Sequence, residues 1–135
     1  MTEEAIVAQG APEAKAQFLA QILREGELYA GLLLGKNGAP DIHLVLLPAK
    51  AEKLTWDQAK KFAADAGGEL PTRREQSLLF ANLKDEFEPY WHWSGEQHAS
   101  YPSNAWGQYF YDGDQVYSHK SNEGRVRVVR RLIIQ

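Results

Sequence analysis

The spacing of hydrophobic residues changes from helical to strand-like near residue 27. Before Gly26, hydrophobic side chains recur at every third or fourth position, which predicts a short amphipathic helix. The side chains that define this helical face are Ala14, Phe18, Leu19, Ile22 and Leu23. The acidic segment 1–12 lacks this spacing, so we expect it to form a loose tail. We therefore predict a tail and short helix over residues 1–26 and a folded domain over residues 27–135.

Two strand-like runs follow, at residues 27–34 and 42–47. They flank a segment rich in turn-forming residues that contains Asn37-Gly38. An Asn-Gly pair tolerates the positive φ angles of a tight hairpin turn. The pattern therefore predicts a β-hairpin.

Two capping-box patterns indicate where two consecutive helices begin. Thr55 stands three residues before Gln58, and Thr72 stands three residues before Glu75. Gly67 follows the first helical pattern and is expected to end that helix. The buried faces are expected to consist of Trp56, Ala59, Phe62, Ala63 and Ala66 in the first helix, and of Leu78, Leu79, Leu83 and Phe87 in the second.

The last third of the chain consists of short strand-like runs and turns. Strands are expected at residues 90–94, 105–111, 115–118 and 125–134, with a hairpin at Asp112-Gly113. The order of one helix, a hairpin, two helices and then several strands predicts an α+β domain. We expect its two central helices to pack on short antiparallel sheets.

Composition excludes several classes of protein. The 135 residues suffice for one domain, and the net charge of −3 provides no field that would attract nucleic acid, so we expect no nucleic-acid partner. No apolar run approaches the length of a membrane span, so no membrane partner is expected. The acidic N-terminus does not resemble a secretory signal. Cysteine is absent, which excludes disulfides and cysteine-based metal centres.

No catalytic or metal-binding motif is present. The four histidines lack helical ligand spacing, and the carboxylates fall at capping or helix-surface positions. Asp112 and Asp114 lack the remaining ligands of a calcium loop. We therefore expect no catalytic residues, no metal and no cofactor. Arg125 and Arg127 alternate with valines, which predicts a solvated face on the last strand.

The segment 97–123 is the strongest candidate for a binding surface. It contains four of the six tyrosines, together with four serines and two histidines. Tyrosine offers a large contact area at little cost in side-chain entropy, and serine and histidine add hydrogen bonds. The alternative, a polar turn-rich segment with half-buried tyrosines, fits the residues equally well. The large aromatic residues of this half are expected to form the core: Trp91, Trp93, Trp106 and Phe110.

Four separated segments resemble one known family: GELPTRRE at 68–75, YWHWS at 90–94, AWGQYF at 105–110 and RVRVVR at 125–130. The chain is similar to the phage and bacterial family of unknown function allied to the C-terminal domain of collagen-like adhesins. This resemblance implies a C-type-lectin-like fold, shared with formylglycine-generating enzymes and with the variable proteins of diversity-generating retroelements. It also implies that the first and last strands pair, which would join residues 27–34 to residues 126–132.

The chain departs from two branches of that fold. Calcium-dependent lectins carry Glu-Pro-Asn or Gln-Pro-Asp and Trp-Asn-Asp, where this chain has Tyr-Pro-Ser-Asn at 101–104 and Ala-Trp-Gly at 105–107. The oxidase relatives use reactive cysteines, which are absent here. The resemblance therefore implies neither a calcium-dependent sugar site nor oxidase chemistry.

The resemblance favours recognition, because the ligand contacts of the retroelement-diversified relatives lie in this same C-terminal region. We therefore expect a non-enzymatic phage or prophage domain that binds a protein or glycan and is located in the host bacterial cytoplasm or on the virion. Two alternatives stay open: a virion- or tail-associated assembly domain that forms a homo-oligomer, and a small phage inhibitor of a host protein. The expected ligand contacts are His98, Tyr101, Tyr109, Tyr111, Tyr117, His119 and Asn122.

Overall fold

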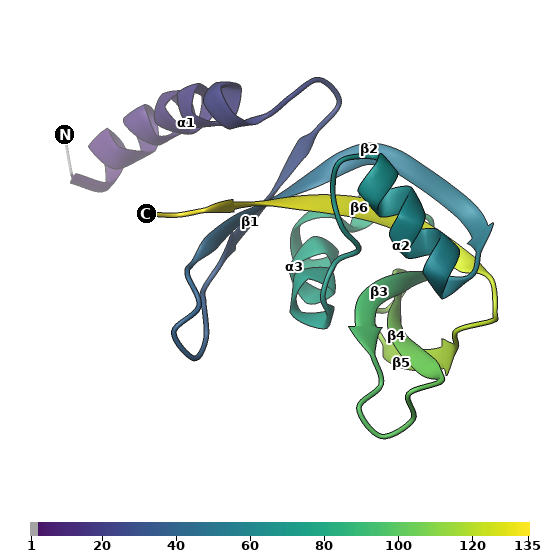
Figure 1. Cartoon of the computed structure of the whole chain (residues 1–135). Coiled ribbons are helices and arrows are strands. Elements are labelled where there is room, and N and C mark those ends of the chain that lie inside the picture. The colour runs from purple at the N-terminus through teal and green to yellow at the C-terminus, as the bar shows by residue number, and fades with distance from the viewer. Residues whose placement is uncertain (1–2) are drawn as a thin grey trace.

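The computed structural model describes the backbone of residues 3–135 and the side chains of residues 12–135 (Figure 1). It has the expected α+β composition. The elements, in chain order, are α1 (Glu3–Ile22), β1 (Leu28–Leu33), β2 (Ile42–Leu54), α2 (Trp56–Asp65), α3 (Arg73–Leu83), the short 3₁₀ helix η1 (Lys84–Glu86), β3 (Trp91–Gln97), β4 (Asn104–Tyr109), β5 (Gln115–His119) and β6 (Gly124–Ile133).

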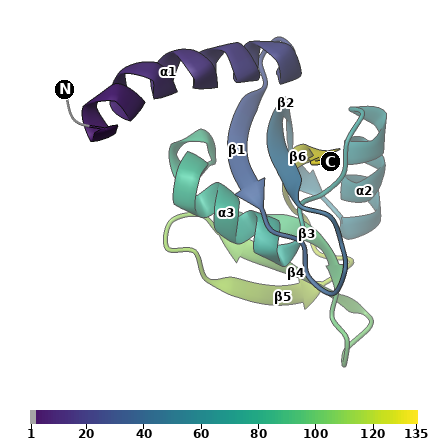
Figure 2. The same ribbon diagram turned by 90° about the vertical axis from the view of Figure 1, so that its left-hand side faces the viewer.

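In this described part of the chain, six strands form one mixed sheet in the order β1-β2-β6-β3-β4-β5. All neighbouring strands are antiparallel except β6 and β3, which pair in parallel at His92 and Arg125. Because this parallel pairing is so short, the sheet has two halves joined at one point. Figure 2 shows α2 and α3 on opposite sides of the β1-β2-β6 half.

The expected pairing of the first strand with the last is wrong. β1 pairs with β2, and β2 is the strand that lies beside β6. The turn at Asn37 and Gly38, which take positive φ angles of 55° and 84°, pairs β1 with β2 as expected, but the other side of β1 is the edge of the sheet. β2 is also longer than predicted and reaches Leu54.

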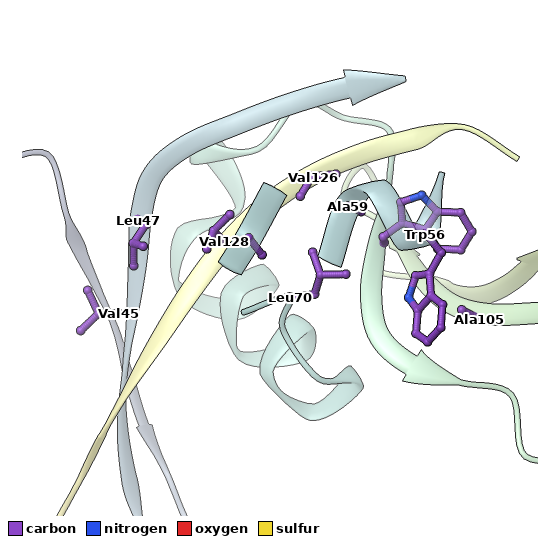
Figure 3. Packing of buried hydrophobic residues seen from close by; sticks show 10 residues of the cluster. Val45, Leu47, Trp56, Ala59, Leu70, Ala105, Val126 and Val128 are labelled. Carbon is purple, nitrogen blue, oxygen red and sulfur yellow. The ribbon is translucent and has the colours of Figure 1, made fainter. Parts of the chain in front are cut away.

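The hydrophobic core has two parts, one on each face of the sheet. On β2, Val45 and Leu47 face α2, whereas Leu44 and Leu46 face α3. This explains why β2 begins with a continuous apolar run, since a strand that is covered on both faces needs no polar alternation. Figure 3 shows part of the first cluster, with Ala59 of α2 close to the β6 side chains.

Both central helices begin as the capping boxes predict. The backbone amide of Thr55 donates to the Gln58 side chain at 3.0 Å. The Thr72 amide donates to Glu75 Oε1 at 2.8 Å, and the Glu75 amide donates back to Thr72 Oγ1 at 3.1 Å. After α2, Gly67 takes a φ angle of 87°, which ends the helix as expected.

The expected loose tail is wrong over residues 3–12, because α1 begins at Glu3 and contains Pro12, whereas the helix expected after the tail is present up to Ile22. The segment is rich in alanine and glutamate, which favour helix, and α1 continues through Pro12 even though proline disfavours helix interiors. Near the end of α1, Phe18 packs on His43 and Tyr29, with ring centroids 4.8 and 5.9 Å apart.

The arginines of β6 do not form a solvated face, which corrects a second expectation. Both faces of β6 are covered, since Val126 and Val128 pack in the cluster beneath α2 and Val129 packs in the cluster beneath α3. Arg127 is buried, Arg130 pairs with Glu27 at 2.7 Å, and Arg131 pairs with Glu75 at 2.6 Å. The sequence alternation could not reveal that this strand is an interior one.

Candidate binding surface

Four aromatic side chains of the C-terminal half form one cluster, which we call the aromatic patch: His98, Tyr101, Trp106 and Tyr117. His98 stacks on Trp106 with an interplanar angle of 15° and ring centroids 5.0 Å apart. Its ring also lies 4.4 Å from Tyr117 and 4.9 Å from Tyr101. The structure therefore brings together three of the seven predicted contact residues.

The backbone beneath the aromatic patch is held by strand pairing and by a closed loop. Trp106 of β4 lies directly opposite Tyr117 of β5. In the β3–β4 loop, His98 Nδ1 accepts hydrogen bonds from the backbone amides of Ser100 and Tyr101, both at 3.0 Å. His98 thus fixes the position of Tyr101 as well as contributing its own ring.

Arg73, in the first turn of α3, lies against one side of the aromatic patch. Its guanidinium carbon is 3.6 Å from the centre of the Trp106 ring, a distance suited to a cation–π interaction. Arg73 Nε donates to Gln115 Oε1 at 2.9 Å, and the Arg73 amide donates to Glu96 Oε2 at 2.6 Å. These bonds hold the arginine in place beside the aromatic rings.

The outer surface of the patch consists mainly of tyrosine. Tyr101 is 55% exposed and Tyr117 is 46% exposed, while His98 and Trp106 are half-buried. The expectation that Trp106 belongs to the core is therefore wrong. It holds for Trp93 and Phe110, which are 0% and 1% exposed.

Trp91 also differs from the core expectation, because it is half-buried. Its ring contacts that of Trp93 edge-on, with centroids 4.4 Å apart.

Tyr109 and Tyr111 lie apart from the patch. Tyr109 is three residues after Trp106 on β4 and pairs with Trp91 of β3, so its side chain projects from the opposite face of the sheet. The Tyr111 ring packs on Tyr109, with centroids 5.4 Å apart. These two predicted ligand contacts therefore do not share a face with the aromatic patch.

His119 and Asn122 hold the turn that follows β5. His119 Nδ1 accepts from the Ser121 amide at 3.1 Å, and Asn122 Nδ2 donates to Ser118 Oγ at 2.8 Å. His119 is two residues after Tyr117 on the same strand and therefore projects from the same face. Both side chains are exposed, and neither belongs to the ring cluster itself.

Sequence reasoning missed two members of this surface, Trp106 and Arg73. Trp106 was assigned to the core because of its size, and no local signal distinguishes Arg73 from the arginine that follows it. The two residues meet because the first turn of α3 packs beside β4, a contact that neither segment encodes alone.

No group of three or more metal-ligating side chains is found among the described residues. None of the helices in the described region is long and apolar enough to cross a membrane. A scan against protein-family models finds no match to the chain, and a search of curated proteins finds no significantly similar relative.

Proposed function

We propose that this chain is a non-enzymatic recognition domain of phage or prophage type, in which the aromatic patch binds a protein or glycan partner. The observation that carries the proposal is the exposure of two adjacent phenol rings, Tyr101 and Tyr117, above a layer of fixed side chains. Tyrosine is enriched at binding hot spots because it combines a large apolar area with one hydroxyl group.

Pre-organisation supports this assignment. The β3–β4 loop is closed by two backbone hydrogen bonds, since the His98 amide donates to the Asn104 carbonyl and the Asn104 amide donates to the Tyr101 carbonyl, each at 2.9 Å. A loop that is already ordered loses little conformational entropy when a partner binds. The patch therefore has the rigidity of a recognition surface.

The strand order supports a C-type-lectin-like relationship as part of the same proposal. If β1 is treated as an N-terminal addition, the remaining unit runs β2-α2-α3-β3-β4-β5-β6, and its first and last strands pair along most of their length. This is the closure that the family resemblance implies, with β2 in the place we expected residues 27–34 to occupy.

A matched pair of variants tests the proposal. Tyr101→Ala/Tyr117→Ala removes the exposed rings of the patch, whereas Tyr111→Ala removes an equally exposed ring (55%) elsewhere. Glycan arrays and quantitative capture of host cell-surface proteins would identify a partner of the wild-type chain. Two hot-spot tyrosines that each contribute about 1–2 kcal/mol predict a loss of affinity on the order of 30-fold or more in the double variant. Equal binding by all three proteins would show that the patch is not the site.

Exposed apolar side chains on the opposite sheet edge favour a second candidate function, self-assembly. β1 is an edge strand, and edge strands pair readily with other chains. The exposed residues on β1 and nearby are Leu28, Leu32, Leu34 and Ile133.

Sedimentation velocity of the wild type, Leu32→Lys and Val116→Lys tests assembly. Leu32 and Val116 are similarly exposed, at 46% and 41%, but lie at opposite edges of the sheet. Self-assembly through β1 predicts an oligomer that only Leu32→Lys dissociates. A wild-type chain that stays monomeric at all concentrations would exclude this function.

A further inference from the structure

A second surface feature lies where β6 begins, next to the single point at which β6 and β3 pair. It is a cleft of about 230 Å³. Its charged and polar walls are Lys50, Glu52, Glu88, His92, Arg125 and Arg127. None of these residues belongs to the aromatic patch. We call this feature the cationic cleft.

Arg127 is the buried wall of the cationic cleft, with 8% of its surface exposed. Its guanidinium donates to the backbone carbonyls of Glu86 and Leu47, but its Nε has no hydrogen-bond partner among the described residues. No carboxylate oxygen of residues 12–135 lies within 4.0 Å of it. Burial of a charge is costly and lowers the pKa of Arg127 from its ordinary value, and the nearby charge of Glu86 offsets this only in part.

Its neighbours on the same strand show that this arrangement is unusual. Arg130 and Arg131 each meet a largely buried carboxylate, Glu27 or Glu75, at 2.7 and 2.6 Å. For Arg127 no such carboxylate is present in the part of the chain whose side chains are described, although the three arginines lie on one strand.

Two further cations face the same space. Lys50 lies directly opposite Arg127 in the β2–β6 register, and like charges at directly opposed positions repel each other. Arg125 has a buried Nε without a partner in the described region, and its contact with Glu52 is long, at 3.7 Å, to a carboxylate that is 65% exposed. The carboxylates of the cleft, Glu52 and Glu88, are exposed and therefore screened by solvent.

His92 adds no charge to this wall near neutral pH. Burial, together with the charges of Arg125 and Arg127, lowers its pKa to about 4, against a hydrogen bond from its Nδ1 to the Tyr90 carbonyl. The cleft thus combines three cations with two exposed carboxylates, and its deepest cation lacks an ionic partner among the described residues.

We propose that the cationic cleft binds a small oxyanion, the carboxylate or phosphate group of a ligand, between Lys50, Arg125 and Arg127. Guanidinium groups match the geometry of both oxyanions, and an anion here would relieve the repulsion between opposed cations. An adjoining hollow of about 310 Å³ shares Glu52 and Arg125 and is lined by Tyr90, Trp91 and Tyr109, which leaves room for the body of such a ligand.

NMR titration of the ¹⁵N-labelled chain with sodium phosphate or sodium acetate, at ionic strength held constant with sodium chloride, tests the proposal. We expect saturable amide shifts confined to residues 50–52 and 124–127. Saturation with phosphate alone, acetate alone or both would identify the oxyanion class that binds. Linear, unsaturated shifts with both anions up to about 100 mM would overturn the proposal.

Two double variants separate a site from general charge. Lys50→Gln/Arg125→Gln removes one lysine and one arginine from the cleft, and Lys61→Gln/Arg74→Gln removes the same two charges from exposed positions elsewhere. Because hydrogen bonds to charged groups are strong, we expect the first pair to weaken binding about 10-fold or more and the second to leave it unchanged. Equal weakening by both pairs would refute a site.

The remaining controls concern folding and independence from the patch. Circular dichroism checks that the variants fold, and Lys50→Gln alone keeps the test valid if the double variant does not, because Lys50 is exposed. Tyr101→Ala/Tyr117→Ala should bind the anion like the wild type, so failure at one site does not imply failure at the other. Loss of anion binding in that variant would contradict a separate cleft.

Discussion

Acidification from pH 7 to pH 5 should destabilise this protein largely through one side chain, His92. The side chain is 3% exposed, and its ring packs edge-on against the stacked rings of Phe87 and Phe110, with centroids 5.3 and 5.2 Å away. Burial, with a smaller contribution from the two neighbouring arginines, lowers its pKa from 6.5 to about 4. The native state therefore holds His92 neutral at a pH where the unfolded chain binds a proton.

The size and direction of the effect follow from that difference in pKa. Above about pH 6.5 both states are neutral, and the free energy of unfolding is unaffected. As the pH falls below 6.5, only the unfolded state gains a proton, so stability decreases until the native state also protonates near pH 4. Integration of this difference gives a loss of about 2 kcal/mol between pH 7 and pH 5, rising to about 3 kcal/mol by pH 4.

Urea denaturation at pH 7 and pH 5 measures this loss of stability in the wild type and in two variants, His92→Gln and His119→Gln. His92→Gln removes the titrating group, and His119→Gln makes the same chemical change at an exposed position. Carboxylates titrate alike in all three, so their contribution cancels. We expect His92→Gln to lose about 2 kcal/mol less than the other two between these pH values. The reasoning would be refuted if all three lost stability equally, or if NMR showed His92 titrating near pH 6.5.

Three stability measurements by urea unfolding test other parts of the structure. Glu75→Gln should cost about 3 kcal/mol or more, because Glu75 is 1% exposed and its loss leaves Arg131 without its bidentate partner; a cost below 1 kcal/mol would contradict this. Asp65→Asn, which removes an exposed ion pair, should change stability by less than about 1 kcal/mol, and a larger loss would show that exposure is a poor guide here. Gly107→Ala should lower the free energy of unfolding by on the order of 2 kcal/mol, because the new Cβ would lie 2.2 Å from the Trp91 ring. An unchanged urea midpoint would show that the Trp91 ring moves aside freely.

Local patterns in the sequence determined most of the secondary structure. The capping boxes at Thr55 and Thr72 and the Asn37-Gly38 turn act over three or four residues, so no tertiary information is needed to interpret them. They predicted the starts of α2 and α3 and the β1–β2 hairpin, and with them the α+β class. Residues 3–12 were the exception, because the absence of helical hydrophobic spacing was given more weight than the helix propensity of this segment.

Alternation along β4 correctly predicted that Trp106 and Phe110 share a face, but not which of them is covered. Phe110 is buried because Phe80 and Phe87 pack over it, whereas Trp106 lies beside Arg73 at the first turn of α3 and remains half-buried. The extent to which each of these rings is buried depends on where α3, a helix from another part of the chain, begins and which residues it places over the strand.

What the sequence determined by itself was therefore the set of helices, strands and turns, because hydrogen bonding and side-chain periodicity within each element are local. Only the tertiary structure decided that β6 is covered on both faces, with Arg127 buried against Glu86 and Phe87, and that Tyr117 joins the aromatic patch while Tyr109 projects from the opposite face. Strand order and register depend on contacts between distant segments, and the same alternating pattern is compatible with an edge strand or an interior one.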